Sequence, residues 1–316
     1  MKKGYKAYEK GLVCRGKQYK IGEIFEEEKA EICDIGMHYC ENPLDCLDHY
    51  PLIDDNGEIV EMTEVEDLDE ENRDTENNKK YCTKKLKIGA KLSLGEMIKA
   101  SLEFIGEKSI EPASSGYYSQ LASSGDNSQL ASSGDNSQLA SSGDRSRLAS
   151  SGDCSRLASS GYYSQLASSG DRSRLASSGD CSRLASSGYY SQLASSGYYS
   201  QLASSGDNSQ LASSGDNSQL ASSGDNSQLA SSGDRSRLAS SGDYSQLASS
   251  GNNSAVANIG INGMAKAAKY SWITLAEHCW EDGLLKLKCV KTEQVDGDRI
   301  KPDTWYKLQD GEFKEV

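Results

Sequence analysis

The sequence predicts a mainly β protein in which a β-solenoid, with about two nine-residue repeats per coil, lies between two smaller parts. A nine-residue period runs through the middle of the chain, and short alternating apolar stretches flank it on both sides. Only 3 Phe among 316 residues argue against one large core of packed helices. We expect a small α+β domain at residues 1–112, the solenoid at 113–268 and a β-rich C-terminal cap at 269–316.

The repeat has the form G-[DY]-x-S-[QR]-L-A-S-S. It begins at Gly116, recurs in strict phase to Gly242 and continues in two degenerate units at Gly251 and Gly260. Composition alone would fit a disordered Gly/Ser tract, but a fixed phase is typical of a solenoid.

Alternation within each unit predicts which side chains face inward. Ser119, Leu121 and Ser123 would share one face of a strand, while Gln120 and Ala122 would share the other. Glycine would supply an unusual φ at the turn, and the following Asp or Asn would bond to nearby backbone. Two units folded back on each other would enclose a thin Leu/Ser interior. This predicts about eight coils and a length of roughly 40 Å, with three units per coil as the alternative.

The variable positions of the repeat are the candidate binding residues. Residues 144–170 and 171–197 are the same string, so repeat number has been free to vary, which suits a binding or spacer surface better than a catalytic site. Arg and Tyr are the residue types that contribute most at protein interfaces, so we expect a docking patch on the solenoid. Its residues would be Arg145, Arg147, Arg156, Arg172, Arg174, Arg183, Tyr162, Tyr163, Tyr189, Tyr190, Tyr198 and Tyr199. The alternative is that Asp–Arg pairs relieve like-charge stacking between coils.

The flanking parts show ordinary strand and helix signals. Strands are predicted at residues 11–25, 58–65, 81–92, 272–277, 284–290 and 304–308. Asn42-Pro43 opens a short helix that ends at Tyr50, and Ser93 with Glu96 forms a capping box for a second helix. We expect this second helix to cover the open end of the first coil, because solenoids need capped ends.

Five metal-ligating side chains lie within a short segment of the N-terminal domain. They are Cys33, His38, Cys40, Cys46 and His49. Cys and His are the ligands that zinc prefers, but the segment has no C-x-x-C pair, and buried structural residues are the alternative. A nucleophile pair of Cys40 with His49 is a third interpretation, although no orienting acid or oxyanion motif accompanies it. We therefore expect no cofactor, with zinc at this cluster as the competing hypothesis.

Composition excludes or disfavours several classes. No run of 18 apolar residues exists, which argues against a membrane span. The first residues lack the apolar segment of a secretory signal, so the nine cysteines are expected as reduced thiols in a cytosol. A net charge of −13 disfavours direct nucleic-acid binding. The repeat also lacks the Gly pair of calcium-binding nonapeptides and the outward Thr rows of ice-binding solenoids.

Three motifs resemble a known group of proteins. They are C-x-G-x-x-Y-x-x-G from Cys14, C-x-x-G-x-H-x-C-E-N-P-L-D from Cys33 and K-x-D-T-W-Y-x-L-x-D-G-x-F from Lys301. Together with the repeats they are similar to phage and prophage proteins that carry a domain of unknown function. The resemblance implies a bacteriophage context and supplies no catalytic residues.

These observations lead to one functional expectation and two rivals. We expect a non-enzymatic phage protein in the host bacterial cytoplasm that binds a host protein through its solenoid and inhibits an anti-phage defence system. The first rival is a structural virion or spacer component, and the second is an enzyme in residues 1–112. Homo-oligomerisation through the C-terminal cap is a further expectation.

Overall fold

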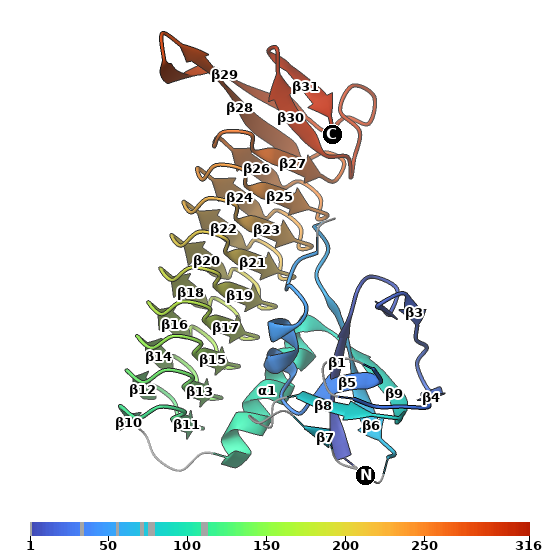
Figure 1. The fold of residues 1–316 in the computed structure, drawn as a ribbon. Helices are drawn as coiled ribbons and strands as arrows, with labels where there is room; N and C mark the ends of the chain where they lie inside the picture. The colour runs from blue at the N-terminus through green and yellow to red at the C-terminus, as the bar shows by residue number, and fades with distance from the viewer. Residues whose placement is uncertain (1, 32–34, 55–56, 70–72, 75–79, 109–112) are drawn as a thin grey trace.

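The computed structural model describes residues 2–31, 35–54, 57–69, 73–74, 80–108 and 113–316. It is mainly β, with a long solenoid, an N-terminal domain at its side and hairpins at its C-terminal end (Figure 1). The predicted fold class is confirmed.

The solenoid consists of two parallel sheets whose strands alternate along the chain. The first sheet contains β10 (Ala113–Ser114), β12 (Gln129–Ser132), β14 (Arg147–Ser150), β16 (Gln165–Ser168), β18 (Arg183–Ser186), β20 (Gln201–Ser204), β22 (Gln219–Ser222), β24 (Arg237–Ser240) and β26 (Ala255–Asn258). The second contains β11 (Gln120–Ser123), β13 (Gln138–Ser141), β15 (Arg156–Ser159), β17 (Arg174–Ser177), β19 (Gln192–Ser195), β21 (Gln210–Ser213), β23 (Gln228–Ser231), β25 (Gln246–Ser249) and β27 (Met264–Ala267). Leu148 of β14 pairs with Leu166 of β16, so one coil takes two units. The solenoid has about nine turns.

The interior is a ladder of leucines between two buried lines of serine hydroxyls. Leucines from Leu121 to Leu247 form one continuous buried cluster, as the alternation predicted. The buried hydroxyls are paired along most of the stack: Ser195 Oγ donates to Ser200 Oγ at 2.7 Å, and Ser200 Oγ donates to the Gly197 carbonyl at 2.8 Å. Because unpaired buried hydroxyls are costly, this relay explains why Ser is fixed in the repeat.

The repeat glycine is required by close stacking and not by an unusual φ, which corrects our expectation. A Cβ on Gly188 would lie 2.1 Å from the carbonyl oxygen of Gly170 in the coil below. The positive φ falls instead two residues later, as in Asn208 with φ 57°. Asn tolerates this left-handed conformation better than most residues, and it is the residue found most often at this position.

The N-terminal domain is a twisted antiparallel sheet with two helices. Its strands, in sheet order, are β4 (Ile24–Glu26), β9 (Lys85–Leu92), β6 (Glu61–Asp67), β1 (Lys2–Tyr8), β5 (Met37–Cys40), β8 (Lys80–Thr83) and β7 (Arg73–Asp74). A hairpin of β2 (Val13–Cys14) and β3 (Lys17–Gln18), the 3₁₀-helix η1 (Pro43–Asp48) and α1 (Leu94–Lys108) complete it. Asn42 caps η1 by accepting from the Leu44 amide, and the Ser93–Glu96 capping box forms.

The N-terminal domain packs on the side of the solenoid, so the expected end-capping role of α1 is wrong. The helix contacts β11, β13, β15, β17 and β19 in turn. Fifteen helical residues span about 22 Å and five strands about 19 Å, so α1 lies lengthwise across them. Apolar packing explains this position, because Met97 and Ile98 of α1 belong to the same buried cluster as Ala140 and Ala176 of the solenoid.

The C-terminal residues continue both sheets as antiparallel hairpins. β28 (Trp272–Glu281) pairs in parallel with β26 and then antiparallel with β29 (Leu284–Gln294). β30 (Tyr306–Gln309) joins β27, and β31 (Glu312–Glu315) follows it. Ile273, Tyr306 and Leu308 extend the leucine ladder, so the cap covers the last coil.

Candidate functional site

The two outer faces of the solenoid have the same repeat sequence but different environments. The outer face of β11 to β27, here the covered face, lies against the N-terminal domain, and its Ala side chains are buried. The outer face of β10 to β26, here the open face, exposes the equivalent Ala row. Ala176 is 1% exposed on the covered face, whereas Ala149, at the same place in the duplicated string, is exposed on the open face.

The expected docking patch does not form one row. Arg147 and Arg183 are exposed on the open face, and Arg145 and Arg172 are exposed in turns on opposite edges. Arg156 is 1% exposed and lies under the chain's own N-terminal domain, so its assignment to partner binding is wrong. The same correction applies to Arg174, which is 7% exposed.

The duplication explains this separation. The identical strings are offset by 27 residues, which is three units, whereas one coil takes two units and 18 residues. An odd number of units moves each copied residue to the opposite face. Arg147 and Arg174 are therefore copies of one position, and a coil of two units places them on opposite faces, where Arg147 is exposed and Arg174 is buried.

The buried arginines form an intramolecular clamp with two acids of η1. Arg156 Nη2 lies 2.7 Å from Asp45 Oδ1 and 3.3 Å from Asp48 Oδ2, and Arg174 contacts the other oxygen of Asp48. Leu52 adds a backbone amide donating to Gln210 Oε1 at 2.8 Å. Sequence analysis missed Asp45 and Asp48, because only the fold brings η1 to strands more than 100 residues away.

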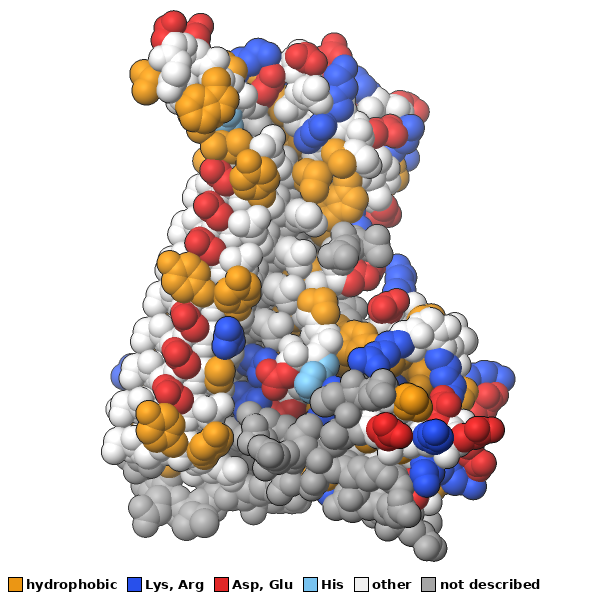
Figure 2. Space-filling view, viewed as in Figure 1, with side chains coloured by type: hydrophobic (Ala, Val, Ile, Leu, Met, Phe, Trp, Pro, Cys, Tyr) orange, Lys and Arg blue, Asp and Glu red, His pale blue; other side chains and the backbone are white. Residues whose placement is uncertain are grey.

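The two edges of the solenoid are the turns that lead into the open and the covered strands, respectively. At the first position after Gly, an Asp carboxylate accepts the backbone N–H of the next coil, as Asp153 Oδ1 accepts from Asp171 at 2.9 Å. Figure 2 shows one edge as a column of acidic side chains interrupted by apolar ones. Exposed Tyr pairs occur at this turn on both edges. Tyr162, Tyr163, Tyr198 and Tyr199 lie on the edge that leads into the open strands, and Tyr189 and Tyr190 on the other.

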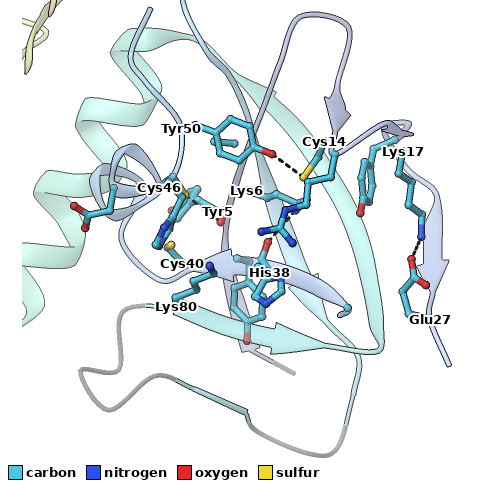
Figure 3. Close-up of a pocket in the computed structure, with 17 residues that line it drawn as sticks. Tyr5, Lys6, Cys14, Lys17, Glu27, His38, Cys40, Cys46, Tyr50 and Lys80 are labelled. Carbon is cyan, nitrogen blue, oxygen red and sulfur yellow. Dashed lines mark hydrogen bonds and ion pairs between the residues drawn. The ribbon is translucent and has the colours of Figure 1, made fainter. Parts of the chain in front are cut away.

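A second candidate region is a cleft of about 490 Å³ in the N-terminal domain. Four cationic side chains line it, and they are Lys6, Arg15, Lys17 and Lys80. Its two acids are already paired, Glu27 with Lys17 of the cleft itself and Asp48 with the buried arginines. Figure 3 shows Cys40, Cys46 and Lys80 on one side of the cleft and Lys17 with Glu27 on the other. The cleft is therefore positive on a protein of net charge −13.

The structure brings together three residues of the expected Cys/His cluster. Hydrogen bonds from Cys46 and from His49 lower the pKa of the Cys40 thiol to about 7, against the opposing effect of burial. The pKa of Cys46 is raised, first by that same hydrogen bond and then by burial. His38 lines the same cleft, and burial with the charges of Lys80, Lys6 and Arg15 lowers its pKa to about 4.

These side chains do not form a metal centre in the part of the chain that the structure describes. No group of three or more His, Cys, Asp or Glu residues within the described ranges is arranged to hold a metal ion. Cys33, the fifth member of the expected cluster, lies outside the described residues.

The fold and these surfaces define a two-sheet β-solenoid with a laterally docked α+β domain. Residues 2–100 match a family described as "Domain of unknown function (DUF7666)". No curated protein and no solved structure matches the chain. Among the described residues, no helix is both long and apolar enough to span a bilayer.

Proposed function

We propose that this is a non-enzymatic binding protein that holds a partner protein on the open face of its solenoid. One observation carries the proposal: the same repeat surface that the N-terminal domain buries on one face is bare on the other. A surface able to bury apolar helix side chains on one side of the coil has the same composition on its other side.

The covered face indicates what kind of partner segment suits the open face. There, Ala rows receive the apolar side chains of α1, and arginines receive carboxylates of η1. The open face has an Ala/Ser groove of about 710 Å³ along β14 to β22. Arg147, Arg183 and Arg237 are exposed on the same sheet. This combination suits an amphipathic helix that carries acidic residues and lies lengthwise along the coils.

The Tyr pairs support binding because they cost stability. Tyr199 has φ 56°, a conformation that Asn adopts at lower cost. Tyr198 takes the place of an Asp and so offers no carboxylate to the next coil. Residues that break a favourable local rule while remaining exposed are typical of functional surfaces. The pairs at both edges would add aromatic contacts at the borders of the open face.

We propose further that the partner is a protein of a bacterial host. The sequence resemblance to phage and prophage proteins supports a host bacterial protein, within an anti-phage defence system, as the partner in the host cytoplasm. The acidic charge of the chain supports a protein partner over nucleic acid.

A structural role is the second candidate, and the β28–β29 hairpin favours it. Trp280, Leu284 and Leu287 of this hairpin are 75%, 64% and 58% exposed. Such a patch is typical of an interface, here with a second copy through the C-terminal cap. Light scattering would test it: a dimer or trimer that Trp280→Ser and Leu287→Ser dissociate supports self-association, and a monomeric wild type contradicts it.

The test of the main proposal compares matched variants in pull-downs from infected cells. Arg147→Gln with Arg183→Gln removes two open-face charges, and Gln is a residue that the repeat already uses there. Lys286→Gln with Lys314→Gln makes the same charge change on the C-terminal cap. A partner bound by the wild type and the cap variant but lost from the open-face variant supports the proposal. A partner retained equally by all three contradicts it, and recovery of the chain in purified virions favours the structural role.

A further inference from the structure

Cys40 and Cys46 form an adjacent pair of free thiols that the binding function does not use. Both are buried, at 2% and 3% exposed, and both line the positive cleft of the N-terminal domain. The single S–H of Cys46 has two acceptors within reach, the Cys40 sulfur and the Tyr5 carbonyl oxygen, which lies 3.3 Å from Cys46 Sγ. Because both thiols line the cleft, a reagent that approaches them through it meets the charge of the cleft.

We propose that Cys40 is a modification site that undergoes thiol–disulfide exchange with small disulfides carrying carboxylates, and that Cys46 is its resolving thiol. The nucleophile in such exchange is the thiolate, which neighbouring donors and cations favour. Cys46 and His49 supply the donors, and Lys80 lies opposite Cys40 on the neighbouring strand.

The reaction has two balanced steps. In the first, the Cys40 thiolate attacks one sulfur of the disulfide RS–SR, the S–S bond breaks, and RS⁻ leaves with a proton from His49 or water. In the second, Cys46 loses its proton, its sulfur attacks the Cys40 sulfur of the mixed disulfide, and a second RS⁻ leaves. Two protein thiols are oxidised to one Cys40–Cys46 disulfide, and one small disulfide is reduced to two thiols. The change is stoichiometric and needs no further oxidant.

The lining of the cleft gives this site its preference for anions. Lys6 is 4% exposed, and its ammonium donates to the His38 carbonyl at 3.0 Å. Glu27 pairs with Lys17, and Asp48 pairs with the buried arginines of the solenoid. The positive charges of Lys6, Arg15 and Lys80 therefore outweigh the negative charges of the lining. Cys154 and Cys181 provide an internal contrast, since they lie on the solenoid edges beside the Asp ladders.

The experiment treats the reduced full-length protein with oxidised glutathione, which is anionic, or with cystamine, which is cationic. Peptide mapping by mass spectrometry follows oxidation of Cys40 and Cys46, with the Cys154 and Cys181 peptides as the reference. We expect oxidation at Cys40 to favour glutathione over cystamine by at least about tenfold relative to the reference, and high salt to reduce the ratio. Equal ratios, or reaction at Cys14 with Cys40 left unmodified, would overturn the proposal.

Two variants separate the roles of the thiols and the cations. In the Cys46→Ser variant, the reaction is expected to stop at a mixed disulfide between Cys40 and glutathione. If the wild type never forms a Cys40–Cys46 disulfide, the resolving role of Cys46 is contradicted. Lys80→Gln, at a partly exposed position, is expected to lower the preference for glutathione with folding unchanged. If Cys46→Ser does not fold, the wild-type mapping and Lys80→Gln still decide the proposal.

Discussion

Replacing Arg156 by Gln removes the guanidinium that meets two acids of η1 beneath the N-terminal domain. Arg156 and Asp45 are 1% and 5% exposed, so the substitution leaves a buried carboxylate without its cation. Removing one partner of a buried pair typically costs about 3–5 kcal/mol. Within the described residues, Arg156 Nε and Nη1 have no hydrogen-bond partner, and Asp45 Oδ1 meets Nη2 at 2.7 Å without hydrogen-bond geometry. We therefore take the lower end, about 3 kcal/mol.

The duplicated strings supply a matched control in the same molecule. Arg183 has the same local sequence as Arg156 but is exposed on the open face. Arg183→Gln is expected to change the free energy of unfolding by less than about 0.5 kcal/mol. Urea titration would compare the two variants, and limited proteolysis would show whether the N-terminal domain is released. Equal effects of the two substitutions would refute the assignment of the covered face.

Three further predictions concern the repeat and the cap. Leu166→Asp places an unpaired charge in the leucine ladder and is expected to destabilise the solenoid by at least about 3 kcal/mol, whereas Gln165→Asp on the open face should have little effect; equal melting temperatures would show that the strand register is wrong. Gly179→Ala would put a Cβ 2.0 Å from the Gly161 carbonyl oxygen, so this substitution should lower the melting temperature. A Cβ on Gly125, in the first coil, would meet only the hydroxyls of Ser128 and Ser123, at 3.6 and 3.8 Å, so Gly125→Ala should leave the melting temperature unchanged. Hydrogen bonds from Lys288 and from two backbone amides lower the pKa of Glu277 to about 2. The contribution of Glu277 to folding stability is therefore complete above its unfolded pKa and is lost as pH falls through about 2. An acid titration in which Glu277→Gln unfolds like the wild type would contradict this.

The solenoid could be predicted from sequence because each unit repeats the same local instruction. Leu and Ser at fixed positions specify an inward face, and one fold satisfies every unit at once. The role of the repeat glycine could not be predicted, because its cause is the carbonyl of a residue 18 positions earlier, as with Gly188 and Gly170.

The candidate binding residues were predictable by type but not by place. Arg147 and Arg174 have identical neighbours in sequence, and only the two-unit coil and the docked domain make one exposed and the other buried. The end-capping role given to α1 failed for a related reason. The apolar side chains of α1 needed a surface to cover, and the sequence offered no sign that the Ala row of a solenoid face would supply it.

The clustering of Cys40, Cys46 and His49 was anticipated from their short spacing, whereas the cationic cleft around them was not. Lys6, Arg15 and Lys80 come from three separate strands or turns, which meet only when β1, β5 and β8 pair. Their charge was hidden in sequence by the acidity of the chain as a whole.

The central claim is that the N-terminal domain covers one face of the solenoid and leaves the chemically equivalent face open. Single substitutions Ala149→Cys and Ala176→Cys, at the same place in the two copies of the duplicated string, test it most directly through their rates of maleimide labelling. The account predicts rapid labelling at position 149 and labelling at position 176 slower by about a hundredfold, which corresponds to an opening free energy of about 3 kcal/mol. Equal labelling rates at the two positions in a folded protein would contradict it.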